Sequence, residues 1–341
     1  MIAEPPSPGR YLLLAVAGLF PERMRERRGT AFRRLETWLG RGKALPGDRV
    51  PDFEALLFHL FGIPLAAKFD APVAPLSYLA DGGAPGELYW LRADPVHMVA
   101  EGADLVLTDP EGLALEPGEA EALAAELRPL FDEPGWRLEA PAPGRWYLGL
   151  PRGAPRLRTT PLGRAVGRGV LARLPEGEEA LLWHRRLNEV QAALHLSPVN
   201  QRREARGLPV INSLWFWGGG RLPRPGAAPC ARVRADAPLA RGLARLHGLE
   251  PAPAPASARE WLAAGPETPE LVLPAGAGGG PGAWPAFVED FFRNWVEPLD
   301  AALAEGGLQA LTLYTEGCPP LRLDRRRRWW RPRTRLAALI D

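Results

Sequence analysis

A continuous run of apolar residues near the start of the chain does most to limit the possible folds. Residues Tyr11–Ala17 form this run, and Gly18 follows it. Such runs are typical of a central strand in a parallel sheet whose two faces are both covered by helices. The run is too short to span a bilayer. We therefore expect a buried strand here, within an α/β fold.

Strand and helix patterns alternate on either side of a β-rich middle part. Apolar residues recur at helical spacing in Ala31–Leu39 and in Phe53–Phe61, and Asp52 stands where an N-cap belongs. Further elements of the alternating pattern are strands at Ala231–Val233, Leu271–Leu273 and Ala310–Tyr314, and a long helix at Trp284–Glu305. Alternation of this kind predicts a doubly wound sheet.

The β-rich part of the chain predicts a small α+β unit. Leu105–Leu107 and Leu113–Leu115 flank a turn signal at Asp109–Gly112, which indicates a hairpin. The other elements expected here are strands at Leu88–Leu91, Trp136–Leu138 and Arg145–Leu150, and a helix at Glu119–Phe131. We accordingly predict a core formed by residues 8–80 and 176–341, an inserted domain at 86–150 and a connector at 151–175.

Composition excludes several classes of protein. The formal net charge of +2 gives no overall attraction to nucleic acid or to an anionic membrane. The only two cysteines, Cys230 and Cys318, lie too far apart in sequence for a zinc motif or a disulfide framework, so we expect reduced thiols in a reducing compartment. The N-terminus does not have the pattern of a signal peptide. A cytoplasmic location with no membrane association is expected.

A long segment with rare residues at fixed spacing suggests a family. It comprises Leu187–Gln191, Ser197–Arg203 and Gly207–Gly220, and its last nine residues read NSLWFWGGG. The segment resembles a stretch of the archaeal-type cofactor-independent phosphoglycerate mutases, and it is most similar to the bacterial RpfE-type regulatory proteins. This resemblance implies an alkaline-phosphatase-like α/β core with one insertion.

The resemblance also implies a site for two divalent metals, which needs carboxylate and imidazole ligands. The first strand of the mutases leads into an aspartate, but Ala17 stands at that place here. Their Asp-His-Ser-Thr-Pro segment corresponds to Glu316–Pro320, where Glu316 can still ligate and Gly317 cannot. Arg325–Arg328 stands where a final histidine is expected, and Ala275–Gly282 contains no ligand. We predict no metal site, no catalytic residue and no cofactor.

A small-molecule site is predicted around the strand that the family segment contains. Gly218, Gly219 and Gly220 can donate backbone N–H groups to an anion, or they can form a turn packed closely against its neighbours. Trp215 and Trp217 share one face of the strand and can line a pocket or belong to the core.

Polar anchors for the same site are expected just before the strand. Asn200, Arg203 and Asn212 can hold a carboxylate or phosphate, or the two asparagines can tie loops together. A competing interpretation is that the whole segment is structural.

The sequence therefore leaves three alternative hypotheses for the function. The first is a non-catalytic, regulatory protein that binds an anionic small molecule. The second is a mutase-like enzyme acting on a phosphorylated three-carbon acid. The third is weak nucleic-acid binding through the tail Asp324–Arg335, where seven arginines surround Trp329 and Trp330. The protein partner and the oligomeric state are not predicted.

Overall fold

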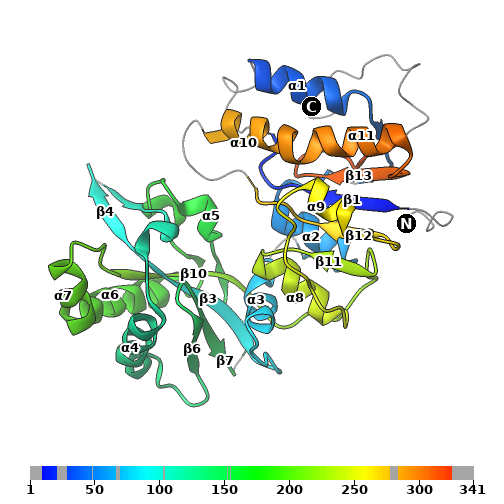
Figure 1. Ribbon diagram of the computed structural model, residues 1–341. Coiled ribbons are helices and arrows are strands. Elements are labelled where there is room, and N and C mark those ends of the chain that lie inside the picture. The colour runs from blue at the N-terminus through cyan, green and yellow to red at the C-terminus, as the bar shows by residue number, and fades with distance from the viewer. Residues whose placement is uncertain are drawn as a thin grey trace. The chain divides into compact units, whose positions relative to one another are not determined.

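A computed structural model describes residues 10–20, 29–47, 49–66, 70–102, 104–151, 153, 155–276 and 283–324. The chain divides into two compact units (Figure 1). Unit 1 combines Met1–Pro64 with Pro225–Asp341, and unit 2 is Leu65–Arg224. The predicted arrangement of one core with an insertion therefore has its counterpart in unit 1, whose chain is interrupted by unit 2.

Unit 1 contains a six-stranded sheet. In spatial order its strands are β11 (Arg232–Arg234), β12 (Glu270–Val272), β1 (Tyr11–Ala15), β13 (Ala310–Tyr314), β14 (Leu321–Asp324) and β2 (Lys43–Ala44). The first four are parallel to one another, whereas β14 and β2 pair antiparallel. The apolar run near the N-terminus thus forms the strand β1, which lies inside the sheet as predicted.

The helices of unit 1 include α1, which packs its apolar stripe into the core. Its buried residues are Ala31, Leu35, Trp38 and Leu39, a spacing that puts them on one face. The helices of this unit are α1 (Thr30–Leu39), α2 (Phe53–Leu60), α8 (Pro238–Leu246), α9 (Ala258–Ala263), α10 (Ala283–Phe291) and α11 (Glu297–Glu305). Asp52 caps α2 as predicted, because its carboxylate accepts a 2.7 Å hydrogen bond from the N–H of Ala55. Figure 1 shows α1, α10 and α11 together on one face of the sheet.

The long helix expected at Trp284–Glu305 is interrupted. Between α10 and α11 lies one π-helical turn, η4 (Phe292–Val296), in which the N–H of Glu297 bonds to the carbonyl of Phe292. Pro298 gives a physical reason, since it has no N–H for the carbonyl four residues before it and its ring would clash there. The expanded turn accommodates the proline without ending the helix.

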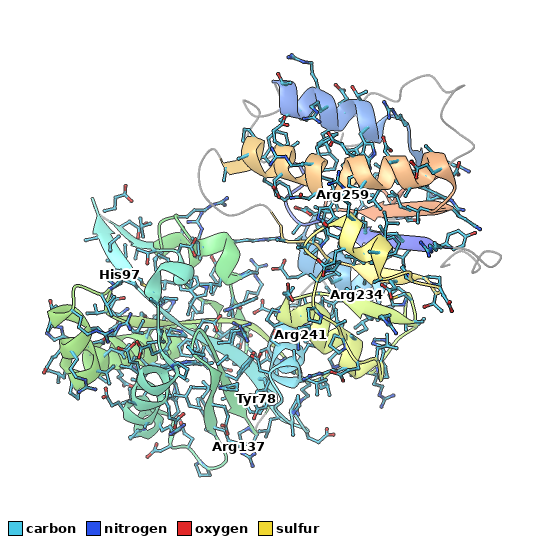
Figure 2. All side chains as sticks on the ribbon, in the orientation of Figure 1. Tyr78, His97, Arg137, Arg234, Arg241 and Arg259 are labelled. Atoms are coloured by element: carbon cyan, nitrogen blue, oxygen red, sulfur yellow. The ribbon has the colours of Figure 1, made fainter. Side chains whose placement is uncertain are left out.

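A buried ion pair ties three elements of unit 1 together. Glu270 of β12 is 1% exposed and accepts hydrogen bonds from Arg234 Nε at 2.7 Å and from Trp261 Nε1 at 2.9 Å. Figure 2 shows Arg234 on β11. Because the buried carboxylate has both a cation and a neutral donor, its burial is compensated.

Unit 2 is built on a four-stranded antiparallel sheet. Its strands, in spatial order, are β10 (Ser213–Gly220), β3 (Tyr89–Val96), β7 (Arg145–Leu150) and β6 (Arg137–Ala142). Two smaller sheets pair β4 (Met98–Glu101) with β5 (Asp104–Leu107) and β8 (Leu157–Arg158) with β9 (Glu176–Gly177). The predicted hairpin is wrong, because β5 pairs with the strand before it. The turn signal at Asp109–Gly112 leads into a 3-10 helix, η1 (Pro110–Leu113).

Helices lie on both faces of the unit 2 sheet. The α-helices are α3 (Val73–Ala80), α4 (Pro117–Leu127), α5 (Leu162–Ala165), α6 (Ala180–Leu196) and α7 (Pro198–Ala205), and the other 3-10 helices are η2 (Arg128–Phe131) and η3 (Leu171–Arg173). On one face α4 and α6 bury an apolar core with alternate strand residues such as Leu214 and Phe216. On the other face Tyr78 of α3 (Figure 2) lies against Trp90 and Tyr147, with ring centroids 4.3 and 5.0 Å apart.

The boundaries of unit 2 differ from those expected. Residues 176–224 were assigned to the core by sequence, but β10 is an edge strand of the unit 2 sheet, where it pairs with β3. Residues 65–80 also belong to this unit, because α3 packs on β3 and β10. The family segment therefore belongs to the insertion and supplies an edge strand of its sheet. Sequence alternation cannot reveal this, since strand pairing over more than 100 residues has no local signal.

Candidate functional site

The carboxyl ends of parallel strands are the usual place for a site in an open α/β sheet. In unit 1 the strands β12, β1 and β13 are adjacent and parallel, so the residues that follow them meet at one edge. Three loop segments start at this edge, namely Val16–Gly18, Leu273–Gly276 and Thr315–Gly317. This edge is where the family resemblance implies the two metals.

Glu316 joins the first and third of these loops. Its Oε1 accepts a hydrogen bond of 2.6 Å from the N–H of Gly18, and its Oε2 accepts one of 3.1 Å from the hydroxyl of Thr315. Both Gly18 and Gly317 have left-handed backbone, with φ of 68° and 70°, which glycine adopts without strain. Both carboxylate oxygens of Glu316 are therefore engaged within the protein.

The remaining groups at this edge do not fit a two-metal centre. Ala17 presents a methyl group, and Gly276 packs so closely on it that an added Cβ would lie 3.1 Å from the Ala17 Cβ. Burial raises the pKa of the nearby Cys318 thiol to about 11, so it is protonated at neutral pH. Over the described ranges of the chain, no three His, Cys, Asp or Glu side chains are grouped to hold a metal ion. One carboxylate cannot replace the several anionic ligands that a pair of divalent ions requires.

The sequence-predicted site residues lie in unit 2, and two of them are on α7. The side-chain amide of Asn200 donates to the carbonyls of Leu194 at 2.8 Å and Ile211 at 2.7 Å, and its oxygen accepts from the N–H of Ile211 at 2.9 Å. Arg203 is completely buried. Its guanidinium bonds to the carbonyl of Pro209 at 3.0 Å, and also to the Glu119 carboxylate and the Leu113 carbonyl.

Asn212 and the two tryptophans also use their polar atoms internally. The amide of Asn212 exchanges two 2.8 Å hydrogen bonds with the backbone of Met98. Trp215 Nε1 donates to the carbonyl of Thr160 at 2.8 Å, and Trp217 Nε1 donates to Asp94 Oδ2 at 2.7 Å. These contacts correspond to the structural alternative, in which the asparagines tie loops together.

The three glycines are part of the strand β10 and do not form a separate turn after it. The N–H of Gly218 donates to the hydroxyl of Thr159 at 3.2 Å, and Gly219 bonds to the carboxylate of Asp70. A Cβ on Gly219 would overlap the Tyr89 hydroxyl, and one on Gly220 would overlap Pro72. The glycines thus permit close packing, which was the alternative to anion binding.

The predicted residues do not share one cavity. Asn200 and Asn212 line a groove of about 330 Å³ in unit 2, whereas neither the tryptophans nor the glycines do. The exposed polar side chains of this groove are His195, Gln201 and Glu204. The sequence therefore identified a structurally important segment but not a single binding site.

A buried polar cluster on β3 was not expected from sequence. Arg92 donates to Asp94 Oδ1 from Nε at 2.9 Å and from Nη2 at 2.8 Å, and both side chains are buried. The guanidinium lies over the rings of Tyr147 and Trp217, 5.3 and 5.2 Å from their centroids. Burial raises the pKa of Asp94, and the charge of Arg92 opposes that rise. Residues i and i+2 share a strand face, which is the signal that could have revealed this pair.

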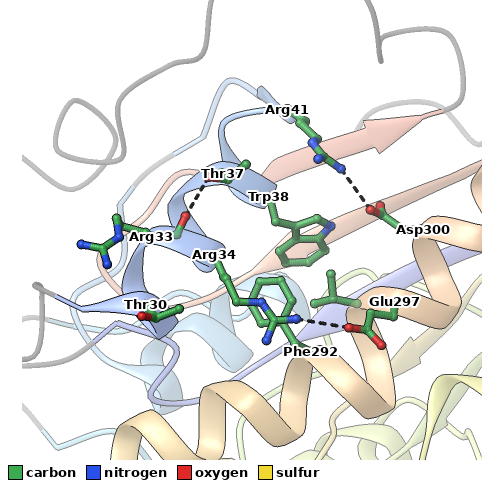
Figure 3. A pocket seen from close by; sticks show the side chains of 10 residues that line it. Thr30, Arg33, Arg34, Thr37, Trp38, Arg41, Phe292, Glu297 and Asp300 are labelled. Atoms are coloured by element: carbon green, nitrogen blue, oxygen red, sulfur yellow. Dashed lines mark hydrogen bonds and ion pairs between the residues drawn. The ribbon is translucent and has the colours of Figure 1, made fainter.

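A second groove lies in unit 1, between α1 and the π-helical turn (Figure 3), with a volume of about 370 Å³. Arginines of α1 line one wall, and acidic residues at the start of α11 line the other. The lining residues are Thr30, Arg33, Arg34, Thr37, Trp38, Arg41, Phe292, Val296, Glu297 and Asp300. Sequence reasoning missed this groove because its two walls are more than 250 residues apart.

Comparison with known proteins supports the fold and no more. No protein family and no curated protein matches the chain. The PH0037 protein from Pyrococcus horikoshii is similar in structure, with a TM-score of 0.55 and 14% identity over 92% of this chain and 86% of that one. The cofactor-independent phosphoglycerate mutase from Thermoplasma acidophilum has 18% identity over 92% and 88% of the two chains, and its TM-score of 0.44 is too low to carry an argument.

The fold class predicted from sequence is confirmed. The chain has a mixed α/β fold, with a largely parallel sheet in unit 1 and an inserted α+β unit, and the PH0037 protein is similar to it in fold. No helix among the described residues is long and apolar enough to cross a membrane. The arginine-rich tail, including Arg325–Arg328, lies outside the described residues.

Proposed function

We propose that the protein is a non-catalytic relative of the cofactor-independent phosphoglycerate mutases that acts by binding a small molecule. The regulatory role implied by the resemblance to RpfE-type proteins belongs to this proposal. The observation that carries it is the bond between Glu316 and the N–H of Gly18, which joins two loops at the edge where metals are implied.

The chemistry of phosphoryl transfer explains why this edge matters. Two metal ions in such a centre stabilise the attacking and the leaving oxygens, and several anionic ligands are needed to hold them. This edge does not supply that ligand set. Ala17 and Gly317 have no ligand atom in their side chains, and both carboxylate oxygens of Glu316 already accept hydrogen bonds within the protein. Loss of the ligands with retention of the fold supports a binding role.

A ligand with an anionic group remains the proposal, but its anchor is not Arg203. That arginine is buried and bonded to three protein oxygens, so it has no accessible donor to offer. Accessible arginines occur on α1 and just after it, where Arg33, Arg34 and Arg41 line the groove of unit 1. Planar guanidinium groups pair well with carboxylate or phosphate oxygens.

Two measurements on the purified protein test this proposal. Phosphoglycerate turnover is followed with added manganese, and thermal unfolding is followed across a panel of carboxylated and phosphorylated metabolites. We expect no turnover and at least one compound that raises the melting temperature. Manganese-dependent turnover would contradict the non-catalytic role, and a panel without any stabilising compound would contradict the binding role.

A further inference from the structure

The groove of unit 1 has two walls of opposite charge. Arg34 of α1 bonds to the carboxylates of Glu289 and Glu297, and Arg41, two residues after the end of α1, bonds to Asp300. The bonds to Glu297 and Asp300 are 3.2 Å long, and all four of these side chains are between 24% and 57% exposed. Exposed pairs of this length contribute little to stability, so a ligand can displace them at small cost.

A buried donor without an acceptor lies between these two ion pairs. Trp38 follows Arg34 by one helical turn on α1, and Arg41 lies two residues beyond the end of this helix. All three side chains line the groove (Figure 3). Trp38 is only 2% exposed, and its Nε1 has no hydrogen-bond partner among the described residues. An unpaired buried N–H is costly, and each such group in a native structure needs an explanation.

Apolar surface completes the groove. Phe292 and Val296, the first and last residues of the π-helical turn, line it beside the indole of Trp38. The guanidinium of Arg34 lies 4.5 Å from the centroid of the Phe292 ring. The volume of about 370 Å³ is that of a small ligand site, since such sites span roughly 300–1,000 Å³.

We propose that this groove binds a small zwitterion, namely an α-amino acid with an apolar side chain. Its carboxylate accepts hydrogen bonds from Trp38 Nε1 and from Arg34 or Arg41, its ammonium pairs with Glu297 or Asp300, and its side chain lies on Phe292 and Val296. Rotation of the exposed Arg41 side chain gives the carboxylate access to the indole. This inference rests on the proposed binding role and names the class of ligand.

The charge pattern favours a zwitterion over a simple anion. An anion that displaced Glu297 from Arg34 would leave that carboxylate without its cation beside the bound anion, and like charges at that distance repel. A zwitterion brings a carboxylate to the arginine and an ammonium to the acidic side chain, so the cation and the anion of the displaced pair each gain a new partner. It also supplies the acceptor that Trp38 lacks.

The test measures binding of L-leucine and L-phenylalanine to the full chain by calorimetry. Two analogues of leucine are the matched controls, 4-methylpentanoate without the ammonium and isopentylamine without the carboxylate. We expect one of the amino acids to bind, and each leucine analogue to bind at least about tenfold more weakly than the amino acid, because each lacks one charged hydrogen-bonding group. Absence of binding by both amino acids, or equal binding by either analogue, would overturn the inference.

Variants locate the site. Trp38→Phe keeps the aromatic packing and removes the N–H, and Glu297→Gln removes one acid. Each is expected to weaken binding about tenfold, and thermal unfolding of each free variant checks that it is folded. Arg259→Gln, an exposed arginine of α9 in the same unit (Figure 2), is the control and should bind normally. Binding that neither groove variant alters would place the site elsewhere and overturn the inference.

These outcomes are distinct from failure of the proposed function. Manganese-dependent turnover would contradict the non-catalytic role whatever binds in the groove. Conversely, a different metabolite that stabilises the protein without sensitivity to Trp38→Phe would preserve the binding role and overturn only this site.

Discussion

The backbone N–H of Gly18 donates a 2.6 Å hydrogen bond to Oε1 of Glu316, a residue 298 positions later in the chain. The bond joins the loop after β1 to the loop after β13, the neighbouring parallel strand. In an open α/β sheet this is the edge at which ligands and metals collect. Here the carboxylate of Glu316 connects the two loops by a hydrogen bond.

Removing this carboxylate should destabilise unit 1. We expect Glu316→Ala to lower the free energy of unfolding by about 1–3 kcal/mol, because the N–H of Gly18 and the hydroxyl of Thr315 lose a charged acceptor. Urea denaturation with and without a chelator measures this. Glu267→Ala, at an exposed loop position, is the control and should change stability by less than about 0.5 kcal/mol. A Glu316→Ala protein as stable as the wild type would show that this hydrogen bond does not contribute to the free energy of unfolding.

Arg203 should be essential for the stability of unit 2. Arg203→Ala leaves the Glu119 carboxylate, which is 15% exposed, without its buried cation. We expect a loss of about 3–5 kcal/mol, as when one partner of a buried ion pair is removed. Arg202→Ala on the same helix is the matched control, because Arg202 is exposed, and should be nearly neutral. Equal melting temperatures for the two variants would contradict this role for Arg203.

Asp81 should make unit 2 sensitive to acid. Burial raises the pKa of its carboxyl, but hydrogen bonds from Arg145 and Tyr147 outweigh burial, so the pKa lies below its ordinary value of 3.8. A lowered pKa stabilises the folded state above pH 3.8, and that contribution is lost as the pH falls through the lower, folded-state value.

Comparison with Asp81→Asn isolates this contribution. The difference in unfolding free energy between wild type and variant should be largest near neutral pH and should shrink below pH 3.8. Urea denaturation at a series of pH values measures it. A difference that grew on acidification would mean that the pKa is raised in the folded protein.

Close packing around the glycines of β10 predicts a steric effect. In Gly219→Ala the new methyl would overlap the Tyr89 hydroxyl and lie 2.8 Å from Leu91 Cδ2, so we expect a loss of about 1–3 kcal/mol. Gly118→Ala is the control, since Gly118 is exposed within α4 and nothing lies near its Cβ position. That control should be neutral or stabilising by up to about 1 kcal/mol, as thermal unfolding can verify.

Local signals in the sequence predicted many elements well. The apolar run predicted the position of β1, Asp52 caps α2 as expected, and the strand at Ala310–Tyr314 has the predicted bounds. Apolar periodicity and capping are properties of a few neighbouring residues, so they can be interpreted without knowledge of the fold.

Long-range contacts were the limit of the sequence interpretation. Arg203 was interpreted as a ligand anchor, but its partner Glu119 lies 84 residues earlier. Likewise, Gly218 and Gly219 were interpreted as an anion-binding segment or a turn, yet the neighbours that leave no room for a side chain there come from α3 and β3. A residue type shows which bonds a side chain can make, and only the fold shows which of them are already made.

Metal content tests the central claim most directly. The protein is purified from cells grown with manganese and zinc, dialysed without chelator, and analysed by plasma mass spectrometry, while its melting temperature is compared with and without EDTA. The absence of a fitting ligand set around Ala17 and Glu316 predicts well below one metal ion per chain and no effect of EDTA. Two tightly bound ions per chain, with a melting temperature that EDTA lowers, would contradict the proposal that this edge of the sheet has lost its metal chemistry.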